Sequence, residues 1–295
     1  EVPVLVQRLC GICPISHLLA ASKATDSFVL GAAPITPTAE KLRRLLHFAQ
    51  VLQSHALHFF YLASPDLLFG FDDEVAHRNI VGVIADHPDI GLMGVRLRKF
   101  GQEVIRTLTG KKIHGTGSLA GGFNKPLSST ECDAIKGQVG EVLEWARKGL
   151  AIARELFLSS EAAHRDFAAA HSSFMSLVAA DGAFELYHGG LRIKDAAGRT
   201  VRDHFDCRGY PDLIHEEVKP WSYMKFPFLA ALGPEDGWYR VGPLARVNNC
   251  DFIRTPLAEV ARQDFIAGGG GQPVQATLAY HWARMIELLH CAEAI

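Results

Sequence analysis

Two cysteines near the start of the sequence stand two residues apart, and a histidine follows four residues later: Cys10, Cys13 and His17. Two intervening residues allow a tight turn that brings both sulfurs into one small volume, and Gly11 would let the backbone approach closely. Thiolates are soft ligands that suit zinc, copper(I), nickel and iron–sulfur clusters. Arg8 and a helix starting just after the pair would favour the thiolate form, and His17 could turn back as a donor to a sulfur. The spacing therefore predicts a metal or redox site.

Residue types alone leave three interpretations of this cysteine pair open. A zinc knuckle needs two more ligands, and the sequence has no second CxxC and no close Cys/His pair. A thioredoxin-like dithiol also has an extended segment, a CxxC and a helix, but the rest of the chain lacks its alternating strands. The third interpretation is two thiols that are simply packed. The scattered cysteines are expected to be buried or incidental thiols in a reducing compartment: Cys132, Cys207, Cys250 and Cys291.

Composition narrows the class of protein. The chain has 295 residues, of which 48% are hydrophobic and 21% charged, as is typical of a soluble globular protein. A net charge of −2 gives no basic field, so nucleic acid and anionic membranes are not expected as partners. No apolar run approaches the roughly 18 residues that cross a bilayer. We therefore expect no membrane span.

Helical periodicity dominates the chain that must position the pair. After an extended segment over 2–9, we expect helices over 16–30, 37–64, 73–87, 89–109, 129–170, 256–267 and 277–295. Thr36 and Asp72 are the expected N-caps of two of them, Pro65 is expected to end the helix before it, and Ser128 with Glu131 has capping-box spacing. A β-hairpin is expected over 191–205, followed by irregular structure over 211–242. The sequence thus predicts a mainly α, multi-helix bundle with a small β-hairpin and irregular insertion, forming a single domain over 1–295.

Two other patterns are weaker candidates. His47, His55 and His58 share one sector of their helix, which could hold a metal, although hydrogen-bonded packing residues are the favoured interpretation. The glycines at 115, 117 and 121 resemble a phosphate loop. They follow a helix and lack the strand–loop–helix context, so a phosphate-binding role is rejected.

The motif Arg8-x-Cys10-Gly-Ile-Cys13-x-x-x-His17 resembles the first cysteine motif of nickel–iron hydrogenase large subunits. Further blocks resemble that family in the same order, at 36–44, 53–62, 110–115, 121–127, 221–227, 241–248 and 281–290. The resemblance covers essentially all 295 residues and implies a helical bundle of the large-subunit type. The later blocks are most similar to the cytoplasmic, bidirectional branch linked to NAD.

The resemblance also implies roles for four residues. Cys10 corresponds to a terminal nickel ligand and Cys13 to a sulfur that bridges nickel and iron. His17 matches a histidine that hydrogen-bonds the bridging sulfur, and Asp66 an acidic position near the open side of the metal pair. For Asp66 the alternative is a turn carboxylate following Pro65.

Some family features have no match in this sequence. A second cysteine pair, an acidic N-terminal segment and an arginine near the iron are all missing. We therefore expect the chain to be the central portion of a longer large subunit, truncated at both ends and inactive alone.

The function implied is reversible heterolytic cleavage of H2 at a nickel–iron centre whose iron carries CO and cyanide. Iron–sulfur clusters would lie in a partner small subunit, and a flavin-containing diaphorase module would pass electrons to NAD or NADP. Three alternatives remain. One is a viologen-type hydrogenase without an NAD link, another a non-catalytic homologue like the related subunit of complex I, and the third a CxxC thiol oxidoreductase.

Overall fold

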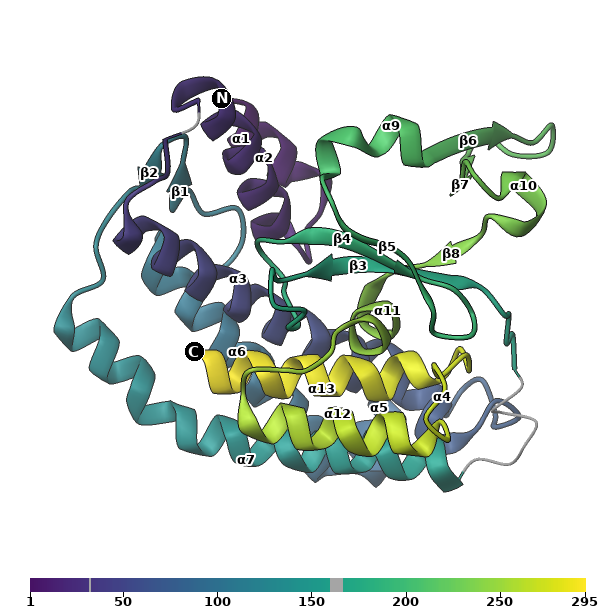
Figure 1. The fold of residues 1–295 in the computed structure, drawn as a ribbon. Coiled ribbons are helices and arrows are strands. Elements are labelled where there is room, and N and C mark those ends of the chain that lie inside the picture. Colours follow the sequence, from purple (N-terminus) through teal and green to yellow (C-terminus); the bar gives the residue numbers. More distant parts are fainter. Residues whose placement is uncertain (32, 160–166) are drawn as a thin grey trace. The chain divides into compact units, whose positions relative to one another are not determined.

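The structure is a computed structural model that describes residues 1–31, 33–159 and 167–295. These residues divide into two compact units, one of Glu1–Leu156 with Glu287–Ile295 and one of Phe157–Ile286. Figure 1 colours the chain in sequence order. Because two compact units can belong to one domain, the single domain stays a prediction.

The first unit is almost entirely helical (Figure 1). Its elements are α1 (Val2–Val6), η1 (Gln7–Leu9), α2 (Pro14–Val29), α3 (Pro37–Leu57), the π-helical η2 (His58–Ala63), α4 (Ser64–Phe69), α5 (Ile80–Asp86), α6 (Pro88–Thr109), β1 (Ser118–Leu119), β2 (Gly122–Phe123), α7 (Ser129–Ser159) and the end of α13 (Ala279–Ala294).

Local capping groups fix several helix ends where the sequence predicts them. The Thr36 hydroxyl accepts the Ala39 N–H at 3.3 Å at the start of α3. Ser128 and Glu131 form a reciprocal capping box, since each accepts the other's backbone N–H, at 2.9 and 3.2 Å. Gly110 ends α6 in the left-handed conformation, at φ 81°. These three predictions are confirmed. The continuation of α7 towards residue 170 includes 160–166, which lie outside the described residues.

The extended segment expected over 2–9 is wrong, because these residues form α1 and η1. The backbone N–H groups of Val4 and Leu5 both donate to the Glu1 carbonyl at 3.0 Å. Pro3 lies in the first turn, where a missing N–H costs nothing. An apolar run this short shows no clear period, so its pattern does not separate strand from helix.

Two other expected helix boundaries are also wrong. Pro65 does not end a helix but lies in the first turn of α4, which follows the π turn of η2. A π turn is a known way for a helix to accommodate a proline break. The N-cap of α5 is Asn79 rather than Asp72, because the Asn79 side-chain oxygen accepts the N–H groups of Val81 and Gly82.

Close approach of α6 to α3 depends on a glycine. A Cβ atom at Gly101 would lie 2.7 Å from the Ala49 carbonyl oxygen and 2.8 Å from Cβ of Gln53. Real side chains do not approach that closely, so the two helices pack tightly only because this position has none. This contact fixes the face of α3 that carries Gln53.

A buried ion pair joins α2 to α3. Arg43 on α3 is fully buried and contacts Asp26 on α2 at 2.5 Å. Arg43 also donates to the Gly122 and Leu119 carbonyls of the β1–β2 hairpin, and Asp26 accepts the Gly121 N–H. Since each remaining polar group of the pair has a partner, the network satisfies the charges that it buries.

The second unit is built on a small sheet (Figure 1). Its elements are β3 (Ser173–Val178), β4 (Gly190–Lys194), β5 (Thr200–Phe205), η3 (Cys207–Gly209), α9 (Tyr210–Leu213), β6 (Ile214–Val218), β7 (Lys225–Leu229), α10 (Gly233–Asp236), β8 (Tyr239–Arg240), α11 (Gly242–Asn249), α12 (Pro256–Gly268) and the start of α13. The strand order is β5-β4-β3-β8, with only β3 and β8 parallel.

The predicted hairpin is β4 and β5, and the helix predicted after Thr255 is α12, so both are confirmed. The irregular structure expected over 211–242 is partly wrong, because β6 and β7 form an antiparallel hairpin there. Asn249 holds α11 to the sheet, donating to the Phe174 and Arg192 carbonyls and the Ser176 hydroxyl. The predicted mainly helical fold with a small β element is confirmed.

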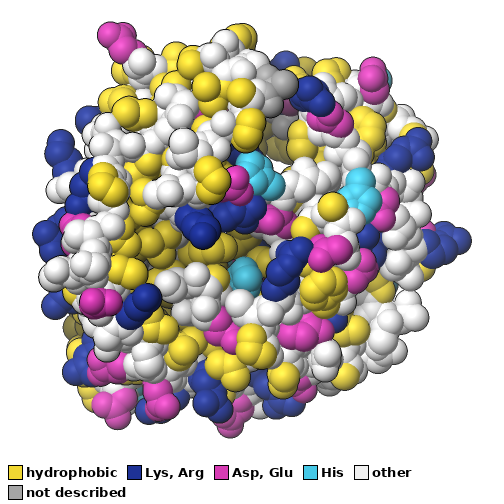
Figure 2. All heavy atoms as spheres, turned by 60° about the vertical axis from the view of Figure 1, so that its left-hand side comes forward, with side chains coloured by type: hydrophobic (Ala, Val, Ile, Leu, Met, Phe, Trp, Pro, Cys, Tyr) yellow, Lys and Arg dark blue, Asp and Glu magenta, His cyan; other side chains and the backbone are white. Residues whose placement is uncertain are grey.

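Among the described helices, none combines the length and the apolar character that crossing a bilayer requires. The face in Figure 2 carries hydrophobic, cationic and acidic side chains intermixed, without one dominant sign of charge.

We expect Asp26→Asn to destabilise the protein by about 3 kcal/mol at pH 7, because it leaves Arg43 buried without its counterion. Burial alone would raise the pKa of Asp26, but hydrogen bonds from Arg43 and Gly121 and the charge of Arg43 hold it below its usual value. A depressed pKa stabilises the fold above the unfolded value of about 4 and loses that effect as pH falls through the folded value. The gap between Asp26→Asn and the wild type should therefore shrink below about pH 4.

Urea denaturation at pH 7 and at lower pH measures this gap. The exposed carboxylate Asp133 on α7 supplies a matched control, and Asp133→Asn should change the unfolding free energy by less than about 0.5 kcal/mol. Equal effects of the two substitutions at pH 7 would contradict the proposed role of the ion pair.

Candidate metal centre

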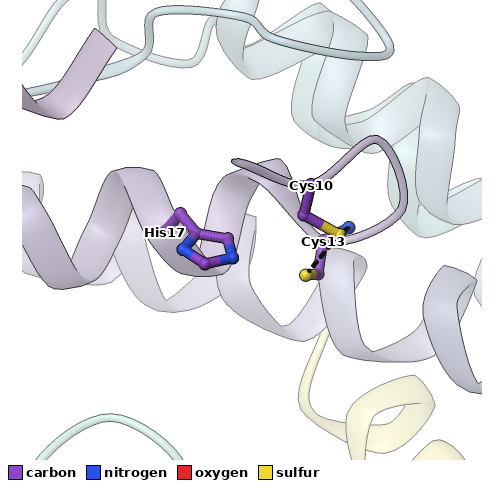
Figure 3. A group of neighbouring side chains, drawn as sticks. All are labelled: Cys10, Cys13 and His17. Atoms are coloured by element: carbon purple, nitrogen blue, oxygen red, sulfur yellow. Dashed lines mark hydrogen bonds between the residues drawn. The ribbon is translucent and has the colours of Figure 1, made fainter. Parts of the chain in front are cut away.

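The two cysteines lie in one turn between η1 and α2. Cys10 follows η1, and Cys13 is the N-cap residue of α2. Their sulfur atoms are 2.8 Å apart (Figure 3). The backbone N–H groups of Ile12 and Cys13 point at the Cys10 sulfur, at 3.3 and 3.1 Å. The turn thus gathers both sulfurs in one small volume, as the spacing predicts, and gives Cys10 three hydrogen-bond donors.

Gly11 does not have the function expected from the sequence. Its φ lies outside the left-handed region, and a Cβ atom there would meet no described heavy atom within 4 Å. Close approach of the described backbone therefore does not require glycine at this position. The prediction that Gly11 is needed for the turn is wrong within the part of the chain that the structure describes.

Three side chains that the sequence analysis missed hold the backbone of the turn. Gln50 and Gln53 on α3 both donate through Nε2 to the Ile12 carbonyl oxygen, at 3.0 and 2.8 Å. Both glutamines are buried, with 1% and 3% of their surface exposed. The His114 ring lies 3.3 Å from the Cys10 carbonyl oxygen. The available signal was that two amides interrupt the apolar stripe of α3, which marks polar groups with a buried partner.

The two sulfurs share a single proton at neutral pH. Burial raises the pKa of Cys10, but hydrogen bonds from the Cys13 thiol and from two backbone N–H groups outweigh it, so the net shift is downward. Burial and the neighbouring Cys10 sulfur raise the pKa of Cys13 to about 11. Arg8 is not among the causes of either shift. A second negative charge beside the first is therefore unfavourable unless a cation compensates for it.

His17 completes the group of neighbouring donors. One ring nitrogen of His17 and the sulfurs of Cys10 and Cys13 all lie within 4.8 Å of one another. Figure 3 shows the ring on α2, beside the turn that carries the sulfurs. No hydrogen bond joins this ring to either sulfur among the described residues, so the hydrogen bond from His17 stays a prediction.

Asp66 is not part of that group. It lies in the first turn of α4, where it pairs with Arg78 at 3.4 Å, and about half of its side chain is exposed. This surrounding fits the turn carboxylate considered as the alternative. Its proposed position beside the metal pair stays a prediction.

The histidines of α3 do not form a second group of metal ligands among the described residues. The His55 ring bonds the Glu287 carboxylate at 2.8 Å, and both side chains are buried. This contact joins α3 to the end of α13 and agrees with hydrogen-bonded helix packing.

The donor set fits a soft divalent metal. Two adjacent sulfurs and an imidazole suit nickel or zinc, and all six cysteines are free. A dication would also remove the repulsion that keeps Cys13 protonated. Donor chemistry alone does not choose between the two metals, because thiolate and imidazole bind both.

A family model described as nickel-dependent hydrogenase matches residues 1–69. The vhu protein of the F420-non-reducing hydrogenase from Methanocaldococcus jannaschii is 38% identical over 293 residues, which cover 99% of this chain and 69% of that protein. The chain therefore belongs to the nickel-dependent hydrogenase family, as the motif around Cys10 and Cys13 predicts.

Other relatives extend the match along the whole chain. The beta subunit of the NAD-reducing hydrogenase HoxS from Cupriavidus necator is 44% identical over 305 residues, so this chain spans 62% of that relative's length. The crystal structure of an NAD+-reducing NiFe-hydrogenase in the H2-reduced state superposes with a TM-score of 0.95 at 50% identity, over 99% of this chain and 65% of that one. The Ni-Fe-Se hydrogenase of Desulfovibrio vulgaris Hildenborough matches over 100% of this chain and 67% of that one, with a TM-score of 0.74. At 21% identity, this last match shows the fold alone. The predicted large-subunit fold is confirmed.

We expect Gln50→Leu and Gln53→Leu to be mild singly, because the other amide still donates to the Ile12 carbonyl. The double variant leaves this oxygen without either donor, which costs about 1–3 kcal/mol. Hydrogen exchange of the Ile12 and Cys13 amides should then accelerate by roughly tenfold or more.

The control is Gln138→Leu on α7, an exposed glutamine whose Nε2 also bonds a carbonyl, at 2.9 Å. It should leave exchange at the cysteine turn unchanged. Wild-type exchange in the double glutamine variant would show that these amides do not hold the turn.

Proposed function

We propose that this chain belongs to the catalytic subunit of a nickel–iron hydrogenase that interconverts H2 with two protons and two electrons. The carrying observation is the Cys10–Cys13 sulfur pair, 2.8 Å apart, in a chain of the nickel-dependent hydrogenase family. Cys10 would be a terminal nickel ligand, and Cys13 would bridge nickel and iron. When bound, the nickel–iron centre with CO and cyanide on iron supplies the heterolytic cleavage of hydrogen.

The residues of this chain would orient the sulfurs and manage charge. Donors from Ile12 and Cys13 stabilise negative charge on the Cys10 sulfur, which makes it a suitable base beside the substrate. Gln50 and Gln53 fix the carbonyl between the two cysteines and thereby limit the directions in which their sulfurs can point. Two thiolates do not complete a four-thiolate centre, so the full protein would supply two more.

His17 and Asp66 would act around the pair. The His17 ring is near enough to both sulfurs to donate a hydrogen bond to the bridging one after a small rotation. Asp66 would accept a proton on the open side of the centre, and its exposed carboxylate is free to exchange that proton with water. In this proposal both residues adjust the centre rather than ligate it.

The electrons would leave through a separate small subunit that holds iron–sulfur clusters, and then through a flavin-containing diaphorase module to NAD. The NAD-reducing relative at 44% identity supports this branch over the F420-non-reducing relatives, at 38% for the Methanocaldococcus jannaschii protein. We place the enzyme in the cytoplasm on the same analogy. A viologen-type hydrogenase without an NAD link is the second candidate, supported by those F420-non-reducing relatives. A non-catalytic complex I-like homologue is disfavoured because both cysteines are retained.

The test is Cys13→Ser in the full-length protein, purified with its partner subunits. Hydrogen-dependent reduction of benzyl viologen and of NAD should fall by roughly 100-fold or more, since losing a ligand costs at least as much as losing its supporting groups. Nickel content should fall in parallel. Cys132→Ser, a half-buried thiol on α7, serves as the control and should retain both. Zinc without nickel in the wild type, or unchanged turnover in Cys13→Ser, would exclude the proposal. Viologen reduction without NAD reduction would favour the second candidate.

The same assay examines the two surrounding residues. We expect His17→Gln to lower turnover about 10–100-fold with nickel retained. Asp66→Asn should lower turnover and change its pH profile. An Asp66→Asn enzyme with the wild-type profile would instead assign Asp66 to its ion pair with Arg78.

A further inference from the structure

A polar cavity of about 350 Å³ lies in the second unit, away from the cysteine turn in the sequence. It is bounded by the β4–β5 turn at Gly198, the end of α11 at Asn248, α12 at Arg262, and the glycine-rich turn ending at Gln272. A water molecule takes about 30 Å³ of liquid. The cavity therefore has room for a small hydrated ion or a larger group that extends outwards.

Lys194 at the end of β4 lines this cavity with a half-buried side chain. Its ammonium donates to the Asn248 carbonyl at 3.2 Å, and among the described residues no carboxylate lies within ion-pair distance. Burial lowers the pKa of Lys194, against the opposing charge of Asp251. An ammonium has three N–H donors, so this cation is partly desolvated and has donors to spare.

Arg262 presents a second cation to the cavity. Its Nε and Nη2 atoms bind Glu259 at 2.8 and 2.9 Å. That carboxylate also accepts the Ile253 N–H and the Gln263 amide. The structure records no partner for Nη1 of Arg262 in the described chain. One edge of the guanidinium thus remains available after its ion pair has formed.

The other charged groups do not neutralise these two cations inside the cavity. Asp251 is the only carboxylate among the described lining residues, and it already binds Arg192 at 2.9 Å with about half of its side chain exposed. Cys250 adds no negative charge, because burial raises the pKa of its thiol to about 12. The cavity wall is therefore electropositive at neutral pH.

We propose that this cavity is a binding site for a phosphate-class oxyanion, held between the Lys194 ammonium and the Nη1 edge of Arg262. Charge-assisted hydrogen bonds from lysine and arginine are the usual means of holding such oxygens. The Gln272 amide at the rim can add a neutral donor. The ligand is free inorganic phosphate or a phosphoryl group carried by a larger molecule. The site is independent of the hydrogenase function proposed above.

The test is calorimetric titration of the full-length complex with inorganic phosphate at fixed ionic strength, since added salt alone would screen the charges. Saturable binding is expected, and Lys194→Gln should weaken it by tenfold or more, whereas Lys194→Arg retains it. Lys219→Gln removes an exposed cation of the same unit that is paired with Glu217, and should leave binding unchanged. Titration with adenosine monophosphate separates the two sources: binding tighter than that of phosphate, and equally sensitive to Lys194→Gln, assigns the site to a phosphoryl group of a larger molecule.

Three results overturn the proposal. One is the absence of saturable binding, as would occur if a carboxylate of another protein segment fills the cavity. Another is binding that Lys194→Gln does not weaken. The third is an equal loss in Lys219→Gln, which would indicate a diffuse charge effect. Nickel content and hydrogen turnover of each variant report separately on folding, so failure of the site is distinguishable from failure of the hydrogenase proposal.

Discussion

Two buried amides that share one carbonyl oxygen form the constraint on which the sulfur pair depends. Gln50 and Gln53 donate to Ile12, which lies between the two cysteines, so the turn is held at its centre rather than at its ends. The helix that carries them is fixed in turn by buried contacts. Arg43 binds it to α2 through Asp26, and His55 binds it to α13 through Glu287. A rigid supporting helix is what a site needs when a small displacement changes its chemistry.

The charge pattern of the turn follows from the same geometry. Three donors surround the Cys10 sulfur, while Cys13 has the neighbouring sulfur beside it. The pair therefore tolerates one negative charge readily and a second only with a cation nearby. This arrangement favours metal binding over a packed pair of thiols, for which no set of converging backbone donors would be needed. Membership in the nickel-dependent hydrogenase family then selects nickel over zinc.

The sequence predicted the parts of this structure that local chemistry decides. Thr36, the Ser128–Glu131 box and Gly110 mark helix ends because capping involves residues a few positions apart. The cysteine turn was predictable for the same reason. The supports of the site were not, because the contacts of Gln50, Gln53 and His114 with the turn span between 38 and 104 positions of the chain. Local competition explains other errors, as where Asn79 rather than Asp72 caps α5.

The central claim is that Cys10 and Cys13 ligate the same nickel ion in the full-length protein. Nickel K-edge X-ray absorption measures the number of sulfur neighbours of that ion directly. We predict sulfur-rich coordination in the wild type, and one fewer sulfur neighbour in whatever nickel Cys10→Ser or Cys13→Ser retains. Nickel whose sulfur coordination is the same in the wild type and in both variants would contradict the claim.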